Sequence, residues 1–184
     1  KETEGDDMMQ NMQRKLKNLG YKDQYARNMV QLNQDGEYFQ EVALINELEA
    51  TDWSWSPLIA DFNLDGYEDI FISNGILRRP NDLDFKSYVS NAFKNRDKED
   101  GMKWLYKSRE NMPSGEVPNE IFMGGPRKFQ IKTGSWIEDR PGFSNGSAYT
   151  DLDNDGDLDL VVNNLNSPAS IYENTVESGN WISL

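Results

Sequence analysis

Cysteine and histidine are both absent from the 184 residues of this chain. Without cysteine, the chain can form neither a disulfide bond nor a thiolate metal site. Without histidine, it lacks the commonest general base and the commonest ligand of transition metals. These two absences exclude the usual nucleophile–base arrangements of catalysis. Oxygen-bearing side chains remain as the main source of chemistry, and we expect no enzymatic activity from this segment.

Positive charge is also scarce, because 19 lysine and arginine residues stand against 32 aspartate and glutamate residues. The net charge of −13 opposes nucleic-acid binding, which requires a basic surface. No apolar run approaches the length that crosses a membrane, so no transmembrane segment is expected. A chain of this length can still bury a hydrophobic core. Much of the acidity is concentrated in two short segments.

The two acidic segments share one pattern, D-x-[DN]-x-D-G-x-x-D. The first reads DFNLDGYED from Asp61 to Asp69, and the second reads DLDNDGDLD from Asp151 to Asp159. Alternating oxygen ligands followed by a glycine that permits a sharp turn suit a hard cation such as Ca²⁺. Carboxylates this close together repel one another unless a cation neutralises them. The pattern predicts two Ca²⁺ sites, and the alternative is a pair of metal-free Asp/Asn/Gly turns.

The spacing excludes an EF-hand. An EF-hand loop requires glutamate at its twelfth position, where these segments have Ile72 and Val162. The same absence argues against dockerin-like loops.

The segments belong to an internal repeat. Asp151 follows Asp61 by 90 residues, and Phe129 follows Phe39 by the same interval. Each acidic segment lies between short apolar runs that are typical of buried strands, so each is predicted to be the turn of a strand–loop–strand unit. These strands are predicted at residues 56–61, 69–74, 146–151 and 159–164, with earlier pairs near 28–33 with 38–39 and 119–124 with 128–129.

The repeated part, residues 28–75, has about the size of one four-stranded propeller blade, roughly 40–50 residues. We therefore predict a mainly β fold, a partial β-propeller of about two and a half four-stranded blades with helical insertions between second and third strands. Because propellers close with roughly four to eight blades, we expect a fragment of a longer chain. The predicted parts are 1–27, the end of one insertion; 28–75, blade strands with the first loop; 76–117, a helical insertion; and 118–184, blade strands with the second loop.

Helical periodicity marks the insertions. Apolar residues in the central insertion recur at helical spacing, with Asp82 or Asp84 as the N-cap, and a second helix is predicted near residues 102–109. A similar N-terminal stripe is stopped by Gly20. Residues 169–174 are predicted as a third strand, and 181–184 as the start of another. The two stripes consist of Phe85, Tyr88, Val89, Ala92 and Phe93, and of Met8, Met9, Met12, Leu16 and Leu19.

The runs TDWSWSPLIADFNLDGYEDIFISNG, FSNGSAYTDLDNDGDLDLVVNNLNSPASIYEN and NMVQLNQDGEYFQEVA resemble the FG-GAP and VCBS-type repeats of integrin-alpha-like β-propellers. The most similar branch comprises exported bacterial VCBS repeat proteins that carry a downstream ASPIC/UnbV-type domain. The resemblance covers roughly residues 28–75 and 119–184, and it does not explain the helical parts.

The resemblance implies side-chain ligands at loop positions one, three, five and nine, and a backbone carbonyl ligand at position seven. The second site would have four carboxylate ligands and the first three, so we expect tighter Ca²⁺ binding at the second. The implied ligands are Asp61, Asn63, Asp65, Asp69 and the Tyr67 carbonyl in the first site, and Asp151, Asp153, Asp155, Asp159 and the Asp157 carbonyl in the second.

A cysteine-free, Ca²⁺-loaded β protein suits an exported location, whether extracellular, cell-surface or periplasmic, where Ca²⁺ is plentiful. The expected function is a binding or assembly module in a cell-surface or outer-membrane complex, with a protein or a glycan as partner. The alternative is part of a polysaccharide-binding or polysaccharide-degrading, lyase-like enzyme. An apolar patch on the helical insertion would favour the module, whereas a cluster of acidic, lysine, tyrosine or arginine side chains would favour the enzyme.

Connectivity and tryptophan positions give two further predictions. The acidic loops join first to second strands and the helices join second to third, so we expect the helices to cover the opposite face and to form the partner-recognition surface.

Trp53 and Trp55 point the same way if their segment is extended, and Trp136 lies in the equivalent connection. We expect most of these rings to be buried between blades rather than exposed as a contact surface. Arg78 and Arg79 are interpreted as a solvated turn or as salt-bridge partners of nearby acids.

Overall fold

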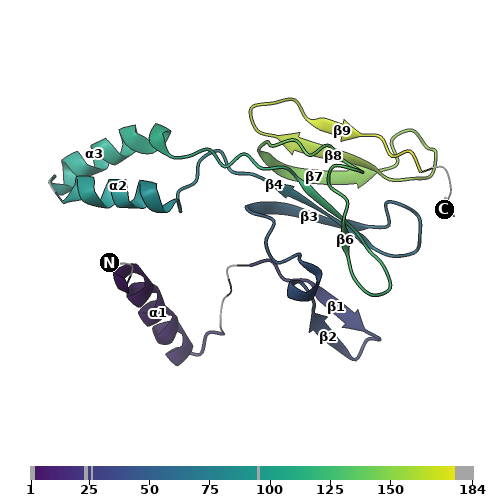
Figure 1. Cartoon of the computed structure of the whole chain (residues 1–184), viewed down its shortest axis with the longest axis horizontal. Coiled ribbons are helices and arrows are strands. Elements are labelled where there is room, and N and C mark those ends of the chain that lie inside the picture. Colours follow the sequence, from purple (N-terminus) through teal and green to yellow (C-terminus); the bar gives the residue numbers. More distant parts are fainter. Residues whose placement is uncertain (1–2, 23–24, 26, 95, 177–184) are drawn as a thin grey trace.

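The computed structural model describes residues 3–22, 25, 27–94 and 96–176. The described part is mainly β, with nine strands in three antiparallel sheets (Figure 1). In chain order the elements are α1 (Thr3–Asn18), β1 (Gln31–Gln34), β2 (Tyr38–Glu41), the 3-10 helix η1 (Leu44–Asn46), β3 (Ser54–Ala60), β4 (Asp69–Asn74), α2 (Leu83–Phe93), α3 (Lys98–Ser108), the 3-10 helix η2 (Arg109–Asn111), β5 (Glu120–Met123), β6 (Gln130–Ile131), β7 (Ser144–Thr150), β8 (Asp159–Asn164) and β9 (Ser170–Tyr172).

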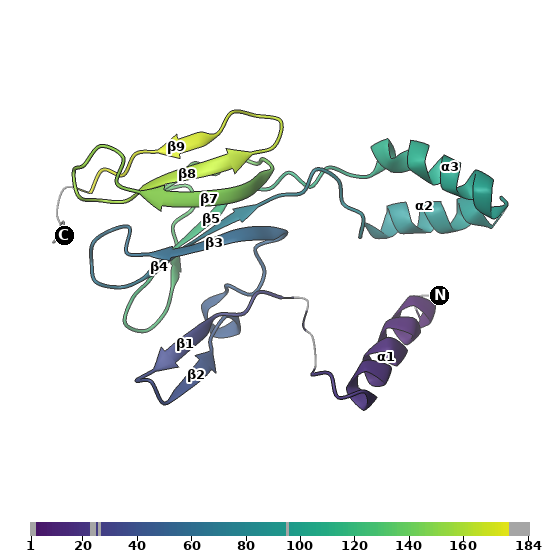
Figure 2. The same ribbon diagram turned by 180° about the vertical axis from the view of Figure 1, so that it is seen from behind.

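The sheets follow one another along the chain as two-, four- and three-stranded units. The middle sheet has the order β3-β4-β5-β6, so each strand pairs with its neighbour in sequence. Helices α2 and α3 lie between its second and third strands. The sheets β1-β2 and β7-β8-β9 lie on either side of it (Figures 1 and 2). The described sheets do not close into a ring.

The 90-residue repeat extends to strand register. Ala60 pairs with Asp69 across β3 and β4, and Thr150 pairs with Asp159 across β7 and β8. Both hairpins also carry an irregularity at the same point, after Ser54 in one and after Ser144 in the other. The predicted strand–loop–strand units are therefore confirmed.

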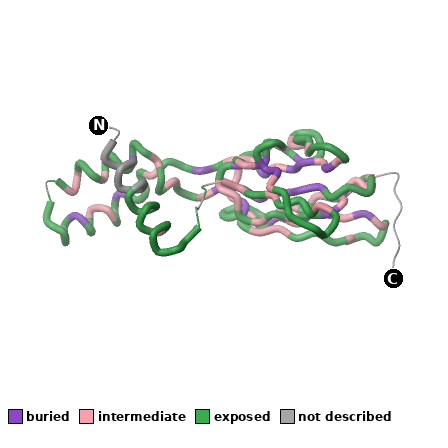
Figure 3. The backbone as a smooth tube through the Cα atoms, turned by 90° about the horizontal axis from the view of Figure 1, so that it is seen from below, coloured by how far each residue is buried: buried purple, intermediate pink, exposed green. Residues whose placement is uncertain are grey.

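The middle sheet packs through both of its faces, because alternate side chains of a strand point to opposite sides. Phe71 joins one apolar cluster, which includes Leu160 and Val162 of the next sheet. Ile70 and Ile72 join another, which includes residues around β1, β2 and η1. Figure 3 shows buried residues along the strands where these sheets stack. The remaining buried members are Ala60, Phe62, Ile121 and Ile137 in the first cluster, and Ala43, Leu48 and Phe122 in the second.

Local capping fixes the helix ends. The Asp82 side chain accepts a hydrogen bond from the Phe85 N–H at 2.8 Å and begins α2, so Asp82 rather than Asp84 is the cap. The second helix begins earlier than predicted, because Asp97 accepts from the Asp100 N–H at 2.9 Å. Helix α1 ends at Asn18, before Gly20 with φ +86°. None of the described helices is long and apolar enough to cross a membrane.

The helices α2 and α3 lie at the end of the sheets opposite the two acidic loops, as connectivity predicts (Figures 1 and 2). They do not cover that end as expected. They form a hairpin that projects away from the sheets, because Trp104 of α3 packs on Tyr88 and Phe93 of α2 rather than on a strand.

The predicted burial of the tryptophans is wrong. Trp53 is half-buried, Trp55 is 47% exposed and Trp136 is 36% exposed. Trp55 lies within the β3 irregularity, where its indole Nε1 donates to the Gly75 carbonyl at 2.6 Å along the sheet edge instead of entering a core. The ring of Trp136 belongs to the connection after β6 and borders a cavity described below.

Several smaller predictions also have outcomes. Arg79 forms a salt bridge with Asp52 at 2.9 Å, and Arg78 donates to the Met112 carbonyl at 3.1 Å, which fits their interpretation as structural residues. The predicted strand at 169–174 corresponds to β9, whereas the predicted strands at 28–33 and 128–129 begin only at β1 and β6. The predicted strand at 181–184 and the side chains of Met8 and Met9 lie outside the described residues.

Candidate metal centre

The two acidic loops have the same backbone conformation. Position four has positive φ in both, +55° at Leu64 and +66° at Asn154. Position six is glycine in both, with φ +90° at Gly66 and +99° at Gly156. Glycine adopts this left-handed region without steric cost, so the shared glycine allows the same tight turn twice.

The carboxylate at position one organises each loop. The Gly66 N–H donates to Asp61 Oδ2 at 2.8 Å, and the Gly156 N–H donates to Asp151 Oδ2 at 3.1 Å. The second oxygen of each carboxylate accepts another loop N–H, from Asp65 in the first loop and from Asn154 in the second. Each loop therefore curls around its own first aspartate.

The carboxylate at position nine is buried in both loops and links the loop to the sheet. Asp69 accepts from the N–H of loop residue Phe62 at 2.9 Å and from the N–H of Gly124, which follows β5, at 2.7 Å. In the second loop, Asp159 accepts from the Leu152 N–H at 2.8 Å and from the Asn174 N–H, which follows β9, at 2.9 Å. These bonds tie each loop to the end of a third strand.

Three carboxylates converge in the second loop. Asp151, Asp153 and Asp159 each offer an oxygen atom, and these atoms lie within 4.8 Å of one another. Oxygen ligands of Ca²⁺ lie about 2.3–2.6 Å from the ion, so two of them can be roughly 5 Å apart at most. The cluster therefore fits a single Ca²⁺ ion. Asp155, the fourth predicted side-chain ligand, instead accepts a hydrogen bond from the Asp157 N–H at 3.2 Å.

The first loop has an amide rather than a carboxylate at position three, so it cannot form the same group of carboxylates. Within the described part of the chain, the second loop provides the only group of three carboxylates this close. Position three is Asn63, whose Nδ2 donates to Asp65 Oδ2 at 2.9 Å. Asp65 Oδ1 accepts from the Tyr67 N–H at 2.9 Å. Three of the five ligands predicted for the second site are thus brought together, whereas the first loop has carboxylates at only two of the equivalent positions.

Negative charge in the loops is only partly compensated. Burial raises the pKa of Asp69 above the usual aspartate range, and the charges of Asp65 and Asp61 add to this rise. Burial likewise raises the pKa of Asp157. The Oδ2 atom of Asp157 accepts from the Val176 N–H, but its buried Oδ1 atom has no hydrogen-bond partner among the described residues. A bound cation would relieve this electrostatic cost.

Sequence reasoning missed a second pair of equivalent residues at the far ends of the same strands. Asn74 Nδ2 donates to the Pro118 carbonyl at 3.2 Å, and Asn164 Nδ2 donates to the Pro168 carbonyl at 2.9 Å. Each asparagine ends a second strand and holds the start of a third. The two residues are 90 positions apart, so the repeat contained the signal. The backbone donors Gly124 and Asn174 left no such signal, because any residue can supply an N–H.

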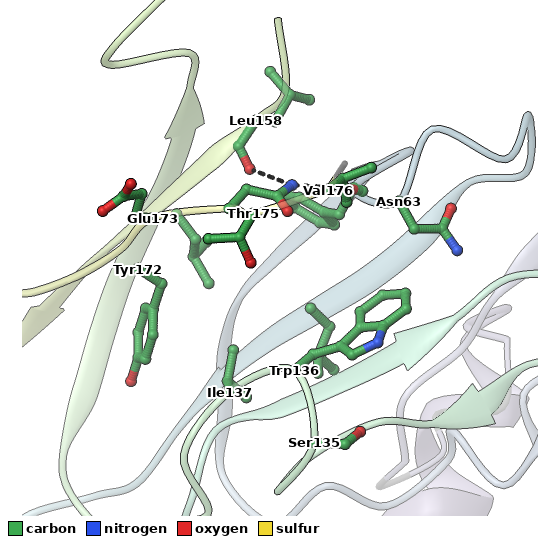
Figure 4. A pocket seen from close by; sticks show the side chains of 13 residues that line it. Asn63, Ser135, Trp136, Ile137, Leu158, Tyr172, Glu173, Thr175 and Val176 are labelled. Carbon is green, nitrogen blue, oxygen red and sulfur yellow. Dashed lines mark hydrogen bonds between the residues drawn. The ribbon is translucent and has the colours of Figure 1, made fainter. Parts of the chain in front are cut away.

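A cavity of about 280 Å³ lies beside the loops, between the middle and last sheets. Figure 4 shows Trp136, Ile137 and Tyr172 around it, with the Asn174 amide donating to the Leu158 carbonyl at its edge. Its wall is continuous with the apolar cluster around Phe62. The cavity lies beside this packed interface between the two sheets, and none of the three clustered carboxylates lines it.

No model of a known protein family matches the sequence, and a search of curated proteins finds no similar one. Residue chemistry and geometry therefore carry the functional assignment.

Proposed function

We propose that the chain is a calcium-stabilised segment of a β-propeller that acts as an exported binding or assembly module in a cell-surface or outer-membrane complex. One observation carries this proposal. Two acidic loops with the same turn conformation and equivalent backbone hydrogen bonds occur at the same end of neighbouring sheets. Such a repeat is expected of a scaffold in which each unit has its own cation.

The order of the strands supports the propeller. The sheets run up and down in sequence order, and the middle one has apolar residues on both faces. Propeller blades are four-stranded sheets of this kind that stack around an axis. Ser147 Oγ of β7 lies 2.9 Å from Ser56 Oγ of β3, so the first strands of two neighbouring sheets lie side by side.

We assign one Ca²⁺ ion to each loop. The second site is tighter, because three of its carboxylates already converge and because its third position is Asp153 where the first loop has Asn63. In the first site the amide oxygen of Asn63 takes the place of the Asp153 carboxylate, since both accept the N–H of the residue two positions later. The ion supplies positive charge that offsets the repulsion between loop carboxylates.

Exposed apolar side chains favour a protein partner over a lyase-like enzyme. Leu83, Met102 and Tyr106 are all exposed on the α2–α3 hairpin. Of the nearby basic residues, Arg79 is engaged with Asp52 and Arg78 with a backbone carbonyl. Large apolar side chains exposed on one hairpin support an interaction surface there.

Titration calorimetry of the chelator-treated chain with CaCl₂ tests the metal assignment. We expect two ions per chain, with the tighter site lost in Asp153→Ala and the weaker site lost in Asp65→Ala. The variant Glu37→Ala removes the same charge at an exposed turn outside the loops and should bind both ions. Absence of binding heat in the unaltered chain, or equal losses in all three variants, would overturn the assignment.

A further inference from the structure

The hairpin of α2 and α3 contains an apolar groove that no described strand fills. The groove has a volume of about 650 Å³, and Lys86, Ser90 and Lys94 line it together with six apolar residues. The apolar residues are Pro80, Phe85, Val89, Phe93, Leu105 and Met112, of which Phe85 alone is buried. Two short helices cannot bury such a surface by themselves, so the groove is suited to a third helix.

Helix α1 has a complementary uncovered face. Met12 and Leu16 lie on one stripe of the helix, which continues to Leu19 beyond its end. Met12 is 59% exposed and Leu19 is 75% exposed, while Leu16 is half-buried. Figure 3 shows exposed residues along the described part of α1. A single helix of 16 residues is marginally stable in water unless it packs on a partner.

The repeat places the two features next to each other. Helix α1 precedes the small sheet β1-β2, as α3 precedes the strands β5 and β6 of the middle sheet. Ala43 and Leu48, which follow β2, pack on the middle sheet through Ile70, Ile72 and Phe122. Segments that enter equivalent strands of adjacent sheets start from the same end of the molecule. Figures 1 and 2 show α1 on the same side as the hairpin.

Charge sets the direction of docking. The last turn of α1 is basic, with Lys15 and Lys17. The start of α2, near the sheets, is acidic, with Asp82 and Asp84. An antiparallel arrangement of α1 and α2 therefore places the basic end of α1 beside the acidic start of α2. It also leaves the end of α1 beside the sheets, where the chain continues to β1.

We propose that α1 of the same chain docks antiparallel to α2 in the apolar groove, and that the insertions of adjacent sheets thereby form one three-helix bundle. The stripe of Met12 and Leu16 fills the space beside Val89 and Phe93. The exposed hairpin residues Leu83, Met102 and Tyr106 do not line the groove and stay free for a partner. Docking requires no metal and is independent of the proposed Ca²⁺ sites.

Disulfide trapping tests the docking, because the chain has no cysteine of its own. We expect Met12→Cys with Val89→Cys to form a cross-link within the monomer under mild oxidation, in dilute, metal-free protein. The matched control Gln13→Cys with Val89→Cys turns the thiol by about 100° around α1 and should cross-link at least about tenfold more slowly. Equal rates in the two variants would overturn the proposal. A cross-link that doubles the mass would overturn the assignment to the same chain.

Hydrogen exchange of the full chain provides a second test that needs no cysteine. We expect the amides of α1 to exchange at least about tenfold more slowly than a free peptide, and Met12→Asp with Leu16→Asp to abolish this protection while amides of β4 remain protected. Exchange of α1 at the free-peptide rate in the unaltered chain would overturn the docking.

Discussion

The acidic residues of each loop divide into two kinds by their surroundings. Position nine is buried and accepts two backbone N–H groups, as Asp159 does from Leu152 and Asn174. Position three is exposed, as Asp153 shows, and makes one short-range contact within the loop. Burial and hydrogen bonding make the first kind part of the fold as well as of the metal cluster, whereas the second kind contributes to the cluster alone.

Asp159→Asn should destabilise the chain even without Ca²⁺, because its amide NH₂ group would face a backbone donor in a buried site. The expected loss is about 1–3 kcal/mol in the free energy of unfolding. Asp153→Ala should change the metal-free stability by less than about 0.5 kcal/mol, because the side chain is exposed. Urea unfolding in the presence of chelator measures both, and equal losses would contradict the division.

Glu120 offers a test by pH. Burial raises the pKa of its carboxyl above the ordinary glutamate value of 4.5, and the charge of Asp139 adds to the rise. The folded state therefore holds this proton more tightly than the unfolded state does. The stability gained from the proton is complete below the unfolded pKa and is lost as pH rises through the folded pKa.

Glu120→Gln cannot titrate, so it should be more stable than the unaltered chain at pH 7 by up to about 1 kcal/mol, a value limited by solvent screening at this half-buried site. The difference should disappear as pH falls toward the ordinary glutamate value. Urea unfolding across this range measures it, with the exposed Glu116→Gln as control. A gain that persists at low pH would show that the charge is not its cause.

Elements are joined where the loops contact the ends of third strands. Gly124 follows β5, and its N–H donates to Asp69. A Cβ atom at this glycine would overlap the carbonyl oxygen of Glu68 in the first loop. The close approach of two backbones therefore requires glycine here, and it keeps loop and sheet in register.

Gly124→Ala should cost roughly 1–3 kcal/mol in the free energy of unfolding, because the added methyl group forces loop and strand apart. Gly125→Ala is a matched control, since its Cβ would lie 3.5 Å from the Lys128 carbonyl oxygen, an ordinary contact. Thermal unfolding of the two variants distinguishes them. Similar melting temperatures would mean that the loop–strand junction is more compliant than its geometry indicates.

The sequence predicted those elements whose signals are local. The apolar run Ile70–Ile72 after an aspartate predicted β4, and the repeat predicted β8 from it. The start of α3 was missed because its cap, Asp97, lies in a charged turn with no apolar periodicity. The exposure of Trp55 depends on a strand irregularity and a bond to the Gly75 carbonyl, which pairing between strands determines. Local patterns do not encode such pairing.

At the scale of the whole molecule, stacked sheets separate the acidic loops from the helical hairpin. The acidic loops lie at one end and the helical hairpin at the other, with two apolar clusters between them (Figure 1). The repeat predicted about two and a half four-stranded units, and the described sheets contain two, four and three strands. The carboxylate cluster occurs in the second loop alone because Asp153 stands where the first loop has Asn63, and the sequence shows this difference directly.

The role of the loops is tested most directly by the melting temperature of the chelator-treated chain as Ca²⁺ is added. A site filled at about 100 times its dissociation constant adds about 2.7 kcal/mol to the free energy of unfolding. For a chain of this size we predict a rise of roughly 5–10 °C from the second site, absent when Asp153→Ala and Asp155→Ala are combined. An unchanged melting temperature in the unaltered chain would identify the loops as metal-free turns and contradict the calcium-stabilised propeller.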